Sequence, residues 1–348
     1  MNRENKKNLV YVIVLVLLMA MTFFIIFRNY DIEETVRILK GADNRWIALA
    51  VLLNMAFVFI GAFNLKTLLK TLGSKVSMLK AVKYLMVETY FCAVTPSASG
   101  GQPMEMLEMK RDGVALSKST ISLIVIAIAY KGTLLVYALM MLAMIKTGII
   151  DNLKGLKWLF YLGIVMNLIA VAFMFLALFC GDIFRKILIK ILDLINSLHR
   201  MKKYDKHLND INMMMKNYHE GAAYILRHRR VFYLVLFTTF IQRTCRFAVT
   251  YAVYRAFGLG GESFIRIILL QAIVNVSADM IPIPGAVGVS ESCYINAFTN
   301  SFGKNRVVAS MVLSRGISFY GLVLVSGIVV VILQITGCYS AADKKEKR

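Results

Sequence analysis

Long apolar runs alternate along this chain with short polar or basic segments, which predicts a series of membrane helices. A helix of about 20 apolar residues is long enough to cross the hydrocarbon core of a bilayer. Runs of this kind, with few or no charges, occur at residues 9–27, 46–65, 119–145, 158–180, 231–257 and 307–335. The pattern predicts an all-α polytopic membrane protein with these six full spans.

Two further apolar segments, 84–109 and 267–302, are interrupted by a break. The breaks read Thr-Pro-Ser-Ala-Ser-Gly-Gly-Gln-Pro at 95–103 and Ile-Pro-Ile-Pro-Gly-Ala-Val-Gly-Val-Ser-Glu at 281–291, and together they hold all 4 prolines of the chain. Irregular backbone survives at membrane depth only where protein or a water-filled cavity covers it. One break in each half of the chain is typical of a transport site.

The distribution of Lys and Arg predicts how the broken segments lie. If each crossed the membrane once, the counts would be 16 inside and 20 outside, against the positive-inside rule. If each is a hairpin that returns to its own side, the counts become 26 inside and 10 outside. We therefore expect two re-entrant hairpins of opposite orientation, and with them an inverted repeat whose tips meet near the midplane.

The rest of the chain is expected to belong to this single membrane domain. Residues 181–230 alternate basic and apolar positions, which fits a cytoplasmic amphipathic helix near anionic lipid or a plain helical connector. A short basic tail, 339–348, follows the last span. Both termini are predicted to be cytoplasmic, and the location is the cell membrane.

Composition changes this picture little. The net charge of +21 lies mainly between the spans, so it indicates orientation and anionic lipid as a partner rather than nucleic acid. The 5 cysteines have no CxxC spacing and the 4 histidines share one basic loop, so no metal or other cofactor is expected. Because no GxSxG, HExxH, P-loop or Rossmann motif occurs, no catalytic residue is predicted.

Candidate binding residues gather at the first break. Its glycines allow close approach of a ligand, and free N–H groups at the start of the returning helix can bind an anion. Carboxylates in the first turns, Glu105 and Glu108, also fit a capping role. We expect a substrate site to include Ser97, Ser99, Gly100, Gly101, Gln102, Pro103 and Glu105.

The second break and the spans supply charged groups at membrane depth. Such groups are costly, so they indicate either a functional site or structural ion pairs. The break contributes Pro284, Gly285, Gly288 and Glu291, with Asp279 just before it, and the spans contribute Lys131, Arg243, Arg246 and Arg315. Arginine binds phosphate bidentately, so the cations favour an anionic or zwitterionic headgroup.

The motifs at 96–103, 281–291 and 314–320 (Ser-Arg-Gly-Ile-Ser-Phe-Tyr) together resemble the transmembrane, flippase-like domain of the lysylphosphatidylglycerol synthase/flippase family. The resemblance covers about residues 8–338. It implies an inner-membrane protein that moves aminoacylated phospholipid, or another lipid-linked headgroup, between leaflets. Members with a cytoplasmic transferase charge phosphatidylglycerol with lysine from lysyl-tRNA and confer resistance to cationic peptides. One departure lies at Tyr130-Lys131, where family members tend to carry an acid beside the base.

The expected function is translocation of a phospholipid, with lysyl- or another aminoacyl-phosphatidylglycerol as the cargo that the resemblance implies. Two alternatives stay open: a phosphatidylglycerol lysyltransferase, as the family name suggests, and a secondary transporter of a small anion. The transferase alternative would require a tRNA-reading domain, and no stretch outside the spans is long enough for one. Further partners could be a second copy of the chain or a lipid-modifying enzyme.

Overall fold

A computed structural model describes residues 32–143, 157–179, 181–199, 204–279 and 281–335, and these are helical apart from short connections. The predicted span 9–27 and the tail 339–348 lie outside the described residues. Helices begin where short polar side chains cap free N–H groups. Asp43 caps α3, Ser77 caps α4 and Ser263 caps α11, each accepting a hydrogen bond from a backbone N–H two or three residues later.

Long helices occupy the predicted spans. They are α3 (Asn44–Thr71), α6 (Leu116–Ala143), α7 (Lys157–Phe179), α10 (Arg229–Ala256), and α13 (Val307–Arg315) continued by α14 (Gly321–Ile335); a short helix, α2 (Ile32–Lys40), precedes them. Among the described residues, Asn44–Thr71, Leu116–Ala143 and Val307–Leu333 are long and apolar enough to cross a membrane. Lys157–Phe173 and Phe264–Ala278 are shorter apolar helices, so the full set of six spans stays a prediction.

Both broken segments fold as helix–turn–helix units. The first consists of α4 (Met78–Val94), the short turn η1 (Pro96–Ala98) and α5 (Gly101–Arg111). The second consists of α11 (Phe264–Ala278), η4 (Pro284–Ala286) and α12 (Val289–Phe302). The arms of each unit pack on one another, and the two turns contact each other. The meeting of the tips is therefore confirmed, whereas the inverted repeat and the depth of the tips stay predictions.

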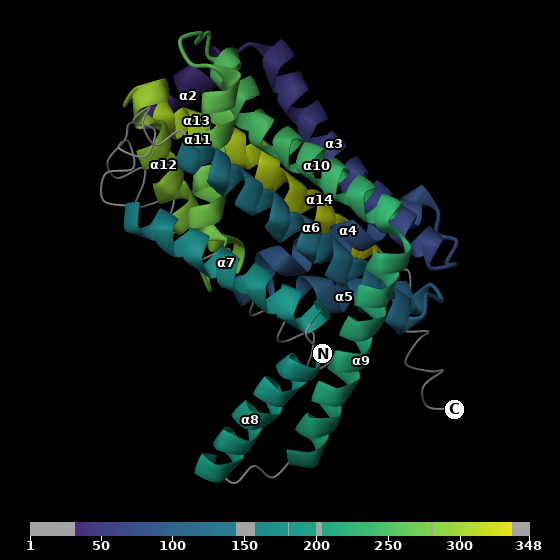
Figure 1. The fold of residues 1–348 in the computed structure, drawn as a ribbon. Helices are drawn as coiled ribbons and strands as arrows, with labels where there is room; N and C mark the ends of the chain where they lie inside the picture. Colours follow the sequence, from purple (N-terminus) through teal and green to yellow (C-terminus); the bar gives the residue numbers. More distant parts are fainter. Residues whose placement is uncertain (1–31, 144–156, 180, 200–203, 280, 336–348) are drawn as a thin grey trace.

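A core cluster of buried apolar side chains lies between α6, α7, α10, α13 and the two arms of the second hairpin. Figure 1 shows α3 and α10 running side by side, and α3 packs along much of α10. Polar side chains join this pair, because Asn64 hydrogen-bonds to Thr238 and Thr239, and Gln242 donates to the carbonyl of Phe57. Hydrogen bonds of this kind hold helices together where apolar packing alone gives little preference.

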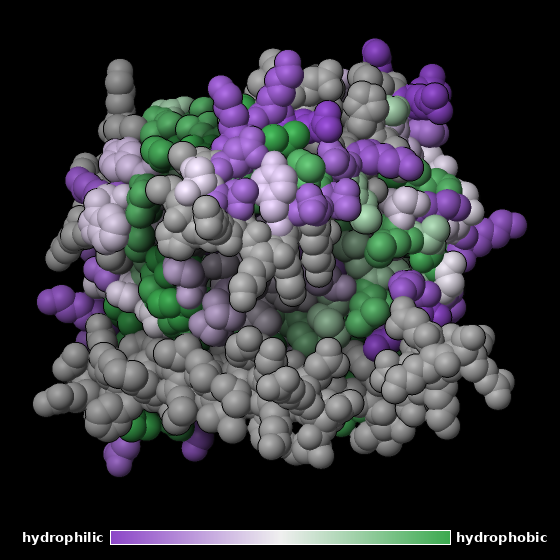
Figure 2. Space-filling view, turned by 90° about the horizontal axis from the view of Figure 1, so that it is seen from below, coloured by the Kyte–Doolittle hydropathy of each residue, from purple (hydrophilic) through white to green (hydrophobic). Residues whose placement is uncertain are grey.

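Large apolar side chains lie on the outer surface of the bundle. Leu52 of α3, Leu139 of α6 and Leu324 of α14 are 61%, 64% and 67% exposed. Figure 2 shows hydrophobic residues reaching the surface between groups of hydrophilic residues. A soluble monomer rarely exposes so much contiguous apolar surface, so these helices fit a lipid environment.

The basic segment 181–230 forms two helices, α8 (Gly181–His199) and α9 (Tyr204–Arg227). They pack against each other and extend away from the other helices in Figure 1, while α9 also contacts α6 and α7. Arg185 donates to Asn212 and Tyr204 to Asp193, which links the pair. On α8 the exposed residues include both Lys186 and Ile187, as an amphipathic surface helix requires.

Candidate functional site

The first hairpin turns at Ser97 and Ala98, whose φ angles of 52° and 53° lie in the left-handed region. Such a backbone costs about 1–3 kcal/mol per residue and persists only where the surroundings hold it. Thr95 does so, since its hydroxyl accepts a hydrogen bond from Gly100 N at 2.9 Å. A Cβ on Gly101 would lie 2.1 Å from the Cys92 sulfur, so glycine permits the close packing of α4 and α5.

The second hairpin has a similar turn. Gly285 has φ 58° and Ala286 φ 49°. A Cβ on Gly285 would lie 2.4 Å from the ring of Phe319, so the glycine lets the turn approach the last span closely. Gly288 N then donates to the Glu291 carboxylate at 2.7 Å, and this hydrogen bond caps the N-terminus of α12.

A cavity of about 180 Å³ lies between the two tips. Ser97 and Ala98 line it from the first tip, and Ile283, Gly285 and Ala286 from the second. Its charged lining residues are Arg246 of α10, Arg315 at the end of α13, and Asp279 at the end of α11. We call this the tip cavity.

Arg315 is held at the tip cavity by a buried carboxylate. Its Nε lies 2.6 Å from Glu291 Oε1, and the Glu291 side chain is 0% exposed. Tyr320 donates to the same oxygen at 2.6 Å. The residues after Arg315, Gly316–Tyr320, form a π-helical turn, a distortion that often occurs at functional sites. Glu291 therefore orients the arginine and does not itself line the cavity.

Asp279 is held by a second cluster. Lys131 of α6 forms an ion pair with it, and the Tyr130 hydroxyl donates to its other oxygen. Lys131 also donates to Asn167 of α7 at 3.2 Å. The acid that the third span lacks beside Lys131 is thus supplied by the tip of the second hairpin, 148 residues away.

Arg243 and Arg246 lie in different places although they are one helical turn apart. Arg246 faces the tip cavity, and its guanidinium stacks on Phe57 with 4.6 Å between Cζ and the ring centre. Arg243 stacks on the Tyr130 ring at 4.0 Å. Within the described part of the chain, neither arginine has a carboxylate within ion-pair distance. Arg246 is therefore a cation available to an anionic ligand.

A second, smaller cavity of about 80 Å³ lies between α3, α4, α5, α6 and α10. Glu88, Gln102, Glu105, Tyr130 and Arg243 line it. Glu105 is 1% exposed, and neither of its carboxylate oxygens has a hydrogen-bond partner among the residues that the structure describes. We call this the acidic chamber. Glu105, Gln102 and Arg243 were predicted for one site with the tip residues, but they line this separate space.

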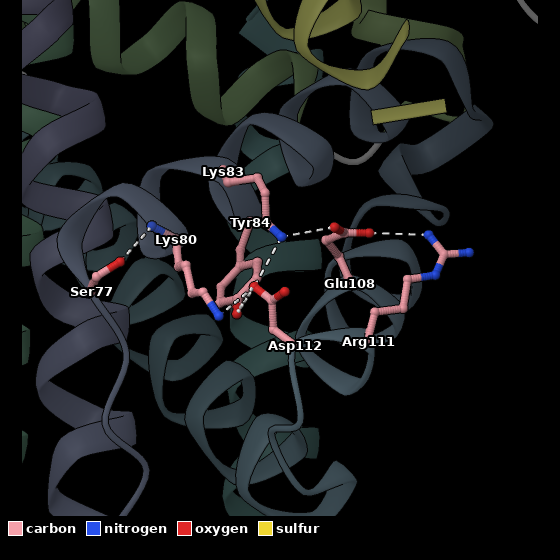
Figure 3. A network of polar contacts seen from close by, with 7 residues as sticks. All are labelled: Ser77, Lys80, Lys83, Tyr84, Glu108, Arg111 and Asp112. Carbon is pink, nitrogen blue, oxygen red and sulfur yellow. Dashed lines mark hydrogen bonds and ion pairs between the residues drawn. The ribbon is translucent and has the colours of Figure 1, made fainter. Parts of the chain in front are cut away.

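Other predicted residues shape the tips rather than line either cavity. The Ser99 hydroxyl donates to the carbonyl of Pro96 at 2.9 Å, Pro103 is exposed on the first turns of α5, and Pro284 is buried. Glu108 belongs to neither cavity. It pairs with Lys83 at 2.9 Å and Arg111 at 3.0 Å in the network that ties the base of α5 to α4 (Figure 3).

Glu88 and Asn167 were not singled out by the sequence reasoning, which included Tyr320 only as the last residue of a family motif. Asn167 and Tyr320 are polar groups in apolar runs, which alone does not separate them from other helix positions. Glu88 carried a usable signal, since it is a carboxylate inside the apolar part of a broken segment.

The chain belongs to the family described as the lysylphosphatidylglycerol synthase TM region, whose sequence model matches residues 9–326. It is 22% identical over 304 residues to a UPF0104 membrane protein of Archaeoglobus fulgidus, covering 85% of this chain and 89% of that one. It is 26% identical over 315 residues to the UPF0104 membrane protein PH1989 of Pyrococcus horikoshii, covering 86% and 90%. The predicted family is thus confirmed, and the chain is a member of a membrane-protein family.

Proposed function

We propose that this protein moves a phospholipid between the leaflets of the cell membrane and binds the phosphate of the headgroup in the tip cavity. The observation that carries the proposal is the pair Arg246 and Arg315 on one cavity, with Arg246 free of any carboxylate partner among the described residues. A guanidinium at low dielectric binds a phosphodiester strongly, because its planar N–H groups match two phosphate oxygens.

The size of the tip cavity supports a headgroup rather than a whole lipid. About 180 Å³ is below the volume of ordinary drug-sized pockets, about 300–1,000 Å³, so the acyl chains would stay in the bilayer. In this proposal six spans surround two opposed hairpins, both termini are cytoplasmic, and rocking of the two halves exposes the cavity to each leaflet in turn. The family name makes lysylphosphatidylglycerol the first cargo to test.

The test uses purified protein reconstituted in vesicles that carry fluorescent phosphatidylglycerol, with a membrane-impermeant quencher reporting the outer leaflet. Wild type is expected to accelerate leaflet exchange over protein-free vesicles, and Arg246→Gln to lose most of that acceleration. Lys304→Gln is the matched control, because it removes an exposed cation in the loop before α13. Exchange no faster than in protein-free vesicles, for fluorescent and aminoacylated lipid alike, would contradict the proposal.

The cavity's volume also favours a second candidate, a secondary transporter of a small anion. Uptake of labelled inorganic phosphate by the same vesicles, without lipid exchange, would select it. The transferase alternative has its own assay, which is transfer of labelled lysine from lysyl-tRNA to lipid by the purified chain.

A further inference from the structure

We propose that the acidic chamber is a proton-binding site, with Glu105 as the group that takes the proton. We also propose that binding and release of this proton drive the alternate exposure of the tip cavity to the two leaflets. The second part rests on the proposed function, and the first part does not. The residues that line the chamber differ from those that line the tip cavity, so the proton site is distinct from the proposed headgroup site.

The surroundings of Glu105 lack what an ionised carboxylate needs. Its side chain is 1% exposed, and neither oxygen accepts a hydrogen bond from any part of the chain that the structure describes. An isolated carboxylate in an apolar interior costs many kcal/mol, and a protonated carboxyl avoids this cost. Glu88 on α4 lies close by, since a Cβ on Gly101 at the start of α5 would lie 3.2 Å from the Glu88 Cγ.

The charges that face the chamber balance when one proton is bound. From α4 comes Glu88, from α5 Glu105, from α10 Arg243, and from α6 the ring and hydroxyl of Tyr130; Cys92 of α4 lies nearby, and α3 presents no charged group. With both glutamates ionised, two negative charges face one guanidinium. One proton makes the chamber neutral, which is the favoured state at low dielectric.

A metal ion fits this chamber poorly. The guanidinium of Arg243 occupies the same space and repels cations, and no group of three His, Cys, Asp or Glu side chains suited to a metal occurs in the described ranges. A proton needs no coordination shell. It bonds to one carboxylate oxygen of Glu105 on arrival and leaves from the same atom, so no other bond changes.

Contacts connect the chamber to the tip cavity. Arg243 stacks on the Tyr130 ring at 4.0 Å, and the Tyr130 hydroxyl holds Asp279, which lines the tip cavity. Loss of the proton leaves an excess negative charge that draws Arg243 toward the glutamates and away from the ring. The hold of Tyr130 on the second hairpin then weakens, and this links proton binding to the tips.

Infrared spectroscopy tests the proton itself, without any transport. A pH titration of the purified protein is expected to show the C=O stretching band of a protonated carboxyl, and Glu105→Gln is expected to lack it. Glu105→Asp keeps a carboxyl at this position and is expected to show the band at a shifted frequency. This variant keeps the proposal testable if Glu105→Gln does not fold. Glu262→Gln is the control, because Glu262 is partly exposed and paired with Arg266. The same band in wild type and Glu105→Gln would overturn the proposal.

Vesicles with a pH gradient test the coupling. In wild type, the gradient is expected to shift fluorescent phosphatidylglycerol toward one leaflet, while in Glu105→Gln the distribution should match that seen without a gradient. A response of wild type to a sodium gradient alone, or an unchanged response in Glu105→Gln, would overturn proton coupling. Lipid exchange without the infrared band would leave the proposed function standing and remove the proton site. The band without any lipid exchange would do the reverse.

Discussion

Lys131 of α6 forms an ion pair with Asp279 at the tip of the second hairpin. Both side chains are mostly buried, at 14% and 13% exposed. The pair ties a long helix to the tip of the second hairpin, which lines the tip cavity, and it is linked through Tyr130 to Arg243. The structure therefore joins in one cluster two charges that lie 148 residues apart in the sequence.

Breaking this ion pair on one side should destabilise the protein. Lys131→Met leaves the Asp279 carboxylate uncompensated, and the free energy of unfolding should fall by about 3 kcal/mol. The double variant Lys131→Met/Asp279→Asn removes both charges and should recover part of the loss. Melting temperatures in detergent measure both effects. A double variant less stable than either single variant would show that the pair is not the main interaction of these groups.

The contacts of Glu291 predict a graded effect at the second tip. Glu291→Gln removes the charge that orients Arg315, whereas Tyr320→Phe removes one hydrogen bond and keeps the ring on which Arg315 lies at 5.5 Å. Tyr320→Phe should cost about 2 kcal/mol, as expected for a hydrogen bond to a charged group, and Glu291→Gln should cost more. Leaflet exchange should fall in the same order. Equal effects of both variants would contradict the positioning role of the charge.

Gly101 should not tolerate a side chain. In Gly101→Ala the new methyl group would overlap the Cys92 sulfur, and overpacking of this kind costs about 1–3 kcal/mol. Cys92→Ala should relieve part of this cost in the double variant. Gly132→Ala is the control, because its Cβ would meet only Leu236 at 3.8 Å. Melting temperatures compare the variants, and a Gly101→Ala protein as stable as Gly132→Ala would disprove the close contact.

The base of the first hairpin should weaken in acid. Burial tends to raise the pKa of Asp112, but hydrogen bonds from Tyr84 and Lys83 outweigh it and hold the pKa below its ordinary value (Figure 3). A lowered folded-state pKa stabilises the fold above the unfolded value of about 4, and this contribution is lost as the pH falls through the folded value.

Asp112→Asn removes this contribution. Wild type should melt at a higher temperature than the variant near about pH 7, and the difference should be smaller at about pH 3, below the unfolded value. Glu262→Gln controls for general acid effects, since its carboxylate lies near Arg266 on another hairpin. A constant difference between wild type and Asp112→Asn at both pH values would contradict the lowered pKa.

Local sequence was enough to predict the broken segments and their turns. Proline and glycine at 95–103 and 281–291 end one helix and begin another independently of tertiary contacts. The structure places η1 and η4 within these stretches. The boundary of α4 was less predictable. It begins at Met78, six residues before the predicted segment, because Ser77 caps it and Lys80 and Lys83 find partners at Asp112.

Local patterns are enough to show that this chain is helical, apolar and twice interrupted, and to identify its family, because these properties depend on neighbouring residues and on motifs. The tertiary structure alone decided which charges meet. Arg243 and Arg246 share a helical face in the sequence, yet they line different cavities, because Arg243 lies over the Tyr130 ring of α6 and Arg246 faces the two tips. Glu105 faces Glu88 rather than the tip, and Lys131 meets Asp279, because these contacts join helices that are distant along the chain and no local pattern encodes them.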